Sequence, residues 1–211
     1  WPDGKLRVAH LEFFFDLSSP WTYLAFTNVE AVVERSGATI TYRPILVGGV
    51  FNAVNPAIYA ARESGDNPRF RHGWKVLKDW ARLAGVTMHF PNQYHPAKSV
   101  HAMRMATVLE SDQKALRAFA KAAFEGFFGG GENLDDPDTL ERFAVSAGLD
   151  SAAIRAASVS DANKARLRAN TDELIARGGY GSPTMFVDKD DMYFGNDQLP
   201  IVEAALKRSA A

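Results

Sequence analysis

The segment Ser19-Pro20-Trp21-Thr22 places a hydroxyl group at the predicted start of a helix. Serine is a favoured helix N-cap, and proline suits the first helical position, where no amide donor is needed. The free amides of such a helix start carry partial positive charge, so they and the Ser19 hydroxyl could stabilise a bound anion. The same pattern also suits a purely structural cap. The residues alone therefore leave both roles open.

The chain of 211 residues contains no cysteine. It cannot form disulfides or cysteine-ligated zinc sites, and it has no thiol of its own for redox chemistry. Any thiolate held at Ser19 would have to belong to a bound molecule. The five histidines show no metal-ligand spacing, and the run Asp188–Asp191 is too short for a calcium loop, so we expect no metal.

Composition and charge limit the classes of partner. An apolar fraction of 46%, with 14 Phe and 4 Trp, predicts a sizeable buried core. A net charge of −1 argues against a nucleic-acid partner, which usually requires a basic surface. No apolar run reaches the roughly 18 residues that span a bilayer, so we expect no membrane association. No signal peptide is visible, and a cytoplasmic location is the default expectation.

The strands and helices around Ser19 follow a recognisable order. A nearly continuous apolar strand over residues 8–15 leads to a helix over 20–36, which Gly37 ends, and then to a strand over 38–43. A crossover of this length predicts a right-handed parallel pair. Strand character returns only at 184–187 and 192–194. Because an isolated hairpin is marginal in water, we expect these two strands to join the same sheet.

The sequence thus predicts an α/β fold with a discontinuous sheet domain. Residues 1–55 and 179–211 would form a βαβ–ββα unit that ends in a helix over 199–207, and residues 56–178 would form an all-helical insertion domain. The expected helices of the insertion begin and end at ordinary Asp, Asn, Ser, Pro and Gly signals. They span 67–83, 96–109, 112–128, 136–148 and 160–177.

Three segments carry a resemblance to a known family: Phe15–Ala25, Tyr180–Val187 and Tyr193–Leu199. Together they resemble the 2-hydroxychromene-2-carboxylate isomerase family, which has a DsbA-like thioredoxin fold and is related to the kappa-class glutathione transferases. In this layout Ser19-Pro20 stands where thioredoxin-type redox proteins keep Cys-Pro-x-Cys. The chain departs from the family pattern at Gln198, where Arg is usual, and at Phe194, where Trp is frequent.

The resemblance implies that glutathione is the cofactor. Ser19 would then stabilise the glutathione thiolate, and a cis Pro183 would let the main chain of Ser182 pair with the cysteinyl part, so that the side chain of Ser182 should matter little. Phe194 and Gly195 would lie at the γ-glutamyl end. Asp197 would bind its ammonium, and Asn196 or backbone amides would take its carboxylate. Asn196 and Asp197 also suit ordinary helix caps.

The resemblance places the substrate at Asn52, Asn55, Tyr94 and His95. A lone histidine beside a proline-rich loop is more often a surface or capping residue. Cations on the helix at 67–83 could meet a carboxylate, although charged helix faces are usually only solvated; they are Arg69, Arg71, His72 and Lys75. Trp74, Trp80, Met103 and Met105 are expected in the core.

The function implied by the resemblance is that of a glutathione-dependent isomerase. The substrate would be a small aromatic molecule, a pyruvate conjugate of the 2-hydroxychromene-2-carboxylate type, isomerised through reversible thiolate addition, bond rotation and elimination. A homodimer is expected from the relatives. Two alternatives stay open: a kappa-class-like glutathione transferase that releases conjugates, and a non-catalytic thioredoxin-fold protein that binds a partner.

Overall fold

The computed structural model describes residues 7–57 and 68–210. Its four-stranded sheet has the order β2-β1-β3-β4. The strands are β1 (His10–Phe15), β2 (Thr39–Pro44), β3 (Thr184–Val187) and β4 (Asp191–Phe194). β1 pairs with β2 in parallel and with β3 antiparallel, and β3 pairs antiparallel with β4. The predicted parallel pair and the attachment of the hairpin to the same sheet are both confirmed.

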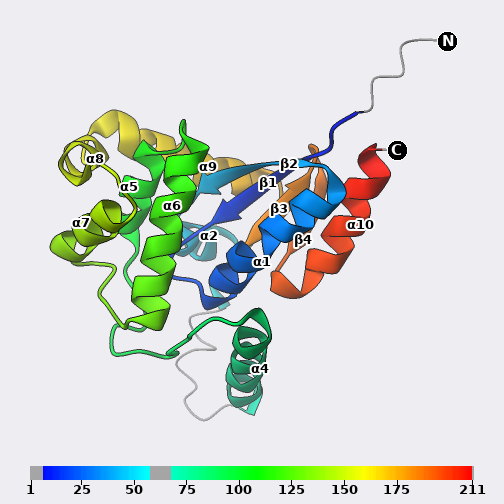
Figure 1. Cartoon of the computed structure of the whole chain (residues 1–211), viewed down its shortest axis with the longest axis horizontal. Coiled ribbons are helices and arrows are strands. Elements are labelled where there is room, and N and C mark those ends of the chain that lie inside the picture. Colours follow the sequence, from blue (N-terminus) through cyan, green and yellow to red (C-terminus); the bar gives the residue numbers. More distant parts are fainter. Residues whose placement is uncertain (1–6, 58–67, 211) are drawn as a thin grey trace.

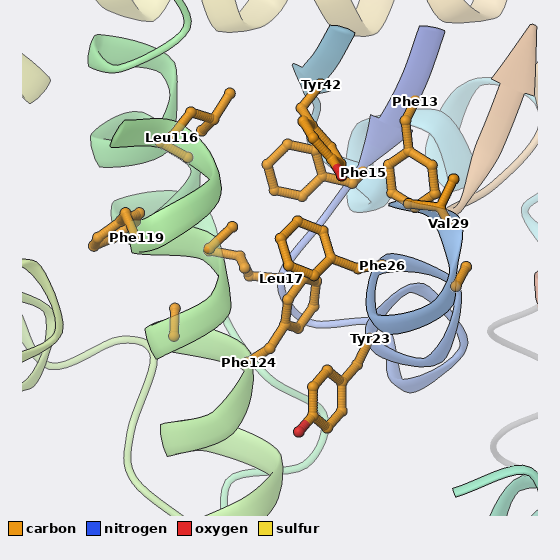
Figure 2. Close-up of a cluster of buried hydrophobic side chains, with 14 of the residues drawn as sticks. Phe13, Phe15, Leu17, Tyr23, Phe26, Val29, Tyr42, Leu116, Phe119 and Phe124 are labelled. Atoms are coloured by element: carbon orange, nitrogen blue, oxygen red, sulfur yellow. The ribbon is translucent and has the colours of Figure 1, made fainter. Parts of the chain in front are cut away.

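β1 lies between β2 and β3 in the sheet, and its phenylalanine side chains are buried on both faces. Phe13 and Phe15 pack with Phe26 and Tyr42 in the larger core, which Figure 2 shows with Leu116, Phe119 and Phe124 of the neighbouring helix. Phe14 points to the opposite face, where it meets Phe186 at a ring distance of 5.7 Å. The triple phenylalanine run therefore fills two cores at once.

The helix α1 (Pro20–Ser36) forms as predicted. Its N-cap is Ser19, and it ends at Gly37, whose φ of 63° is the left-handed conformation that glycine adopts without strain. The last helix, α10 (Leu199–Ala210), packs beside α1 on the same face of the sheet (Figure 1). A short 3-10 turn, η2 (Asn196–Gln198), leads into it.

Between β2 and β3 the described chain is helical, as expected. The helices are α2 (Val47–Val54), α4 (Pro68–Ala84), α5 (Val100–Val108), α6 (Gln113–Phe124), the π-helix η1 (Glu125–Gly129), α7 (Pro137–Ser146), α8 (Ser151–Ser158) and α9 (Asp161–Ala176). α2 and α9 contact each other on the Phe14 face of the sheet. Helices α5 to α8 gather at one side of the molecule (Figure 1).

The helical boundaries differ from the sequence prediction at several places. α2 and α8 were not predicted. The helix expected from residue 96 begins only at Val100, because Ser99 is held by a hydrogen bond from its hydroxyl to Asp16. The helix expected over 112–128 changes to π-helix after Phe124. Asn67, expected to open α4, lies outside the described residues.

The larger core includes residues of the sheet, of α1 and of the helices α5 to α7. One continuous hydrophobic cluster thus joins segments from both proposed domains. The division at residues 55/56 and 178/179 stays a prediction. Within the described part of the chain, no helix is both long and apolar enough to span a membrane.

Candidate functional site

Ser19 links the first turn of α1 to its surroundings through four hydrogen bonds, one of which is from the Tyr23 amide to the Ser19 carbonyl at 3.1 Å. Its Oγ accepts from the Thr22 amide at 3.2 Å, which is the N-cap bond, and its own amide donates to the Asp16 carbonyl at 3.2 Å. The hydroxyl also donates to the main-chain carbonyl of Ser182 at 3.1 Å. Capping therefore leaves the hydroxyl facing the loop before β3. The predicted juxtaposition of Ser19 and Ser182 is present.

The peptide bond between Ser182 and Pro183 is cis, as the sequence predicted. The side chain of Ser182 is more important than expected. Its Oγ accepts from the Asp16 amide at 2.9 Å and lies 2.7 Å from Thr22 Oγ1. Ser182 is 7% exposed, and Thr22 is fully buried. This hydroxyl pair fastens the loop before β3 to the first turn of α1.

The fully buried Asp16 carboxylate joins three chain segments beneath Ser19. It accepts from the amide and hydroxyl of Ser18 at 2.8 and 2.7 Å, from the Val47 amide at 2.8 Å and from the Ser99 hydroxyl at 3.1 Å. Burial raises the pKa of Asp16 above its usual value, while these donors act in the opposite direction. Asp16 thus positions the start of α1 relative to α2 and α5.

Ser19 opens into a cavity of about 670 Å³ with a mostly apolar wall. Such a volume and lining are usual for a small-molecule site. Polar groups from Ser18, Ser19 and Ser182 lie along part of the wall. The remaining lining residues are largely aromatic or apolar and come from α1, α2, α4, the segment 90–96 and the ends of β3 and β4. They are Pro20, Trp21, Val47, Phe51, Asn55, Arg69, Gly73, Trp74, Leu77, Phe90, His95, Pro96, Tyr180 and Phe194.

The structure brings five of the predicted site residues to this cavity. They are Ser19, Ser182, Phe194, Asn55 and His95. The other predicted residues do not line it. Of these, Asn52 and Tyr94 are exposed. Pro183 and Gly195 directly follow the lining residues Ser182 and Phe194 in the chain, whereas Asn196 and Asp197 are further along the turn after β4.

The turn after β4 shows what the residues of the predicted γ-glutamyl site contact. Gly195 has a φ of 99° and donates its amide to the Pro183 carbonyl at 3.2 Å, which ties this turn to the cis-proline loop. The Gln198 side chain accepts from the Phe194 amide at 3.0 Å. Asp197 is exposed, whereas Asn196 is 2% exposed and lines a different groove. Asp197 is therefore the more accessible of the two side chains.

Asn92 fixes the segment that carries His95 to the cavity. Its side chain donates to the Phe127 carbonyl in the π-helix at 3.0 Å and accepts from the Tyr94 amide at 3.0 Å. Its carbonyl accepts from the His95 amide at 3.1 Å. The His95 ring meets Phe90 edge to face at 4.6 Å. His95 thus belongs to an ordered cavity wall.

The aromatic wall was largely missed by the sequence analysis. Trp74 was expected in the core, but it is 41% exposed and lines the cavity because α4 lies across from Ser19. Trp80 is half-buried, whereas Met103 and Met105 are buried as expected. Trp21, Phe51 and Tyr180 also line the cavity. The sequence could have indicated their place in the cavity wall, because they lie within four residues of the predicted site residues Ser19, Asn55 and Ser182.

Arg69 brings a cation to the otherwise neutral wall. Among the described residues that line the cavity, it is the only arginine, lysine, aspartate or glutamate. A guanidinium beside an apolar cavity favours a ligand with a carboxylate. Arg71, His72 and Lys75, the other cations considered, are exposed and do not line the cavity.

A second, smaller groove lies on α1, α4 and α10. It has a volume of about 250 Å³ and is lined by Asn28, Ala31, Val32, Arg35, Trp80, Leu83, Ala84, Asn196, Leu199, Pro200 and Glu203. Neither Ser19 nor Ser182 reaches it. We therefore place the functional site at the larger cavity. The described residues include no group of three or more acidic or histidine side chains that could hold a metal ion.

The chain is similar to proteins of known activity along nearly its whole length. It is 28% identical to a 2-hydroxychromene-2-carboxylate isomerase of Sphingobium xenophagum over 202 residues, which cover 93% of this chain and 97% of that protein. It is 23% identical to a kappa-class glutathione S-transferase of Rattus norvegicus, with coverage of 91% and 88%. A solved 2-hydroxychromene-2-carboxylate isomerase superposes with a TM-score of 0.76 at 27% identity and covers 95% of each chain.

These similarities confirm the resemblance that the three sequence segments indicated. The family model of the DSBA-like thioredoxin domain matches residues 10–207, which include every strand and all but the end of the last helix. The sheet order, the cis Pro183 and the helices between β2 and β3 agree with this assignment. The chain belongs to the DSBA-like thioredoxin domain family.

Proposed function

We propose that the protein is a glutathione-dependent isomerase for a small aromatic substrate of the 2-hydroxychromene-2-carboxylate type. The observation that carries this proposal is the position of the Ser19 hydroxyl. It lies at the start of a 17-residue helix, beside the carbonyl that precedes cis Pro183, and it faces a mostly apolar cavity. The names of the isomerase and kappa-class relatives support this choice.

The residues at the cavity fit glutathione, whose polar groups are spread along a short peptide. Ser19 and the amides that begin α1 would hold the sulfur. The main chain of Ser182 would pair with the cysteinyl part as an added strand does. Asp197 is exposed in the 3-10 turn that follows β4, three residues after the lining residue Phe194, and would receive the γ-glutamyl ammonium.

The chain has no thiol of its own, so the nucleophile must come from the cofactor. Glutathione bound there would supply a thiolate that adds reversibly to an activated double bond and allows the bond to rotate. Ser19 keeps the sulfur ionised by donating a hydrogen bond to it. The helix start adds a favourable electrostatic contribution, and together these effects lower the thiol pKa by about one to two units from about 8.5.

The aromatic wall orients the substrate and excludes water from the reacting bond. Trp21, Trp74 and Phe90 offer flat apolar surfaces from three different segments. Holding both reactants in one cavity makes addition effectively unimolecular. Arg69 shares this wall, and its guanidinium would attract the carboxylate of the substrate. Asn55 and His95 supply polar contacts at the same cavity.

A glutathione balance during turnover tests the proposal. An isomerase returns the cofactor, so product should accumulate well beyond the glutathione present while the free thiol stays constant. The kappa-class relatives favour one alternative, a transferase. Glutathione lost in proportion to turnover, with a conjugate in the product, would establish the transferase instead. Absence of any reaction or glutathione binding would favour a non-catalytic binding protein.

A further inference from the structure

The hydroxyl of Ser19 has one proton, and the structure shows where that proton points. Ser19 Oγ accepts from the Thr22 amide at 3.2 Å and donates to the Ser182 carbonyl at 3.1 Å. A thiolate held by Ser19 needs the same proton, because a sulfur anion can only accept. The bond to the Ser182 carbonyl and the bond to sulfur therefore exclude each other for this hydroxyl.

The Ser182 carbonyl cannot easily reorient within the protein to reach another hydrogen-bond donor. Ser182 is 7% exposed, and its side chain is fastened by the Asp16 amide at 2.9 Å and by Thr22 Oγ1 at 2.7 Å. The neighbouring Pro183 carbonyl accepts from the Gly195 amide at 3.2 Å, which fixes the loop from the other side. A confined carbonyl that loses its donor loses stability unless another donor replaces it.

We propose that the ligand releases the Ser19 proton by donating its own peptide N–H to the Ser182 carbonyl. This inference rests on the proposed function and adds a selection rule to it. Ser19 can then donate to sulfur without leaving the carbonyl unpaired. The site therefore activates a thiol only when a peptide N–H lies on the carbon next to the CH₂–S group, as in a cysteinyl peptide. Simple thiols can enter the cavity but are not ionised there to the same extent.

The coupling involves no covalent change in the protein. The thiol loses its proton to solvent, Ser19 stays neutral, and its O–H changes acceptor from the carbonyl oxygen to sulfur. The ligand N–H takes the vacated position at the carbonyl. Three hydrogen bonds serve Ser19 and Ser182 in the resulting arrangement: Thr22 amide to Ser19, Ser19 to sulfur, and ligand N–H to Ser182. The Thr22 amide continues to polarise the hydroxyl and makes it a better donor.

The test compares glutathione with an analogue in which a CH₂ group replaces the cysteinyl N–H and nothing else changes. The pKa of each bound thiol is measured from the ultraviolet absorbance of the thiolate, for the wild type and for Ser19→Ala. In the wild type, we expect the bound analogue to have a thiol pKa higher by roughly one unit than bound glutathione. In Ser19→Ala this difference should disappear, because no proton has to be released.

Two results would overturn the inference. One is an equal thiol pKa for both ligands bound to the wild type. The other is a difference that persists in Ser19→Ala, which would mean that the N–H acts on sulfur without Ser19. Both results leave the proposed function intact if bound glutathione is ionised and supports turnover. If bound glutathione keeps the pKa of free glutathione, the proposed function itself fails, and the inference fails with it.

Discussion

At the scale of single residues, the position of Ser19 depends on hydrogen bonds made by buried neighbours, above all the Ser182 hydroxyl. Ser182 was expected to act through its main chain alone, yet its hydroxyl contacts the Asp16 amide and the Thr22 hydroxyl. Thr22 stands at the position of the second cysteine in a Cys-Pro-x-Cys motif. A chain that has replaced both cysteines by hydroxyl residues thus uses one hydroxyl toward the cavity and the other to fasten the cis-proline loop.

Removing the Ser182 hydroxyl should destabilise the protein. We expect Ser182→Ala to lower the free energy of unfolding by about 1–3 kcal/mol, because the buried Asp16 amide and Thr22 hydroxyl lose a partner. Urea unfolding followed by circular dichroism measures this change. Ser182→Thr is the matched control, since it keeps a hydroxyl at the same carbon and should retain most of the stability. Equal losses for the two variants would contradict the role of the hydroxyl.

At the scale of elements, a partly buried cluster of charges attaches α9 to the sheet. Arg43 on β2 forms ion pairs with Glu12 at 3.0 Å and with Glu173 at 2.6 Å, and it lies 5.1 Å from the centre of the Phe14 ring. Arg177 reaches Glu12 at 2.7 Å and covers the ring of Phe186 at 3.8 Å. This cluster joins α9 and the residue that follows it, Arg177, to β1 and β2. β1 leads to Ser19, and β2 leads to α2.

Replacing Arg43 should destabilise the protein, because it pairs with three carboxylates and one of them, Glu110, is buried. We expect Arg43→Met to lower the free energy of unfolding by about 1–3 kcal/mol, since Glu12 and Glu110 would each lose one basic partner while keeping Arg177 and Arg166 respectively. Chemical denaturation gives the value. Arg35→Met serves as the control, because Arg35 is 56% exposed in its pair with Glu203 and should matter far less. A loss for Arg43→Met no larger than that for Arg35→Met would refute this role of the cluster.

The contact between α1 and α10 should weaken in acid. Hydrogen bonds from Arg35 and then from Lys207 lower the pKa of Glu203 from 4.5 to about 2. Because the folded protein holds this carboxylate more strongly ionised than the unfolded chain does, the interaction stabilises fully above pH 4.5 and is lost as the pH falls toward 2. The stability difference between the wild type and Glu203→Gln should therefore shrink over this range. Thermal unfolding at several pH values measures it, and a constant difference would oppose the assignment.

Much of this arrangement could be predicted from local sequence signals. The cap at Ser19 and the end of α1 at Gly37 follow from patterns of neighbouring residues. The attachment of the β3–β4 hairpin to β1 through β3 follows from the marginal stability of an isolated hairpin. The start of α5 at Val100 could not be predicted, because it depends on the bond from Ser99 to the distant Asp16. The cavity position of Trp74 likewise depends on how α4 packs against α1, which the periodicity of one helix does not determine.

At the scale of the whole molecule, the cavity lies between two groups of segments. The start of α1 and the loop before β3 line one part of it, and α4 and the segment 90–96 line another. Leu24 of α1 packs with Leu77 and Ala81 of α4, and this contact places the aromatic wall opposite Ser19. Ser19 thus comes from the predicted thioredoxin-like part, and much of the aromatic wall comes from the predicted insertion. In the proposed function, the first part would hold the thiolate, and the helices between β2 and β3 would hold the aromatic substrate.

The proposed function requires that Ser19 lowers the thiol pKa of bound glutathione, and a thiolate absorbance titration of the complex measures this pKa. We expect a bound pKa about one to two units below that of the free thiol, and a rise by a similar amount in Ser19→Ala with the fold unchanged. Turnover should fall along with the thiolate fraction. A bound thiol that titrates identically in the wild type and in Ser19→Ala would disprove the role of Ser19.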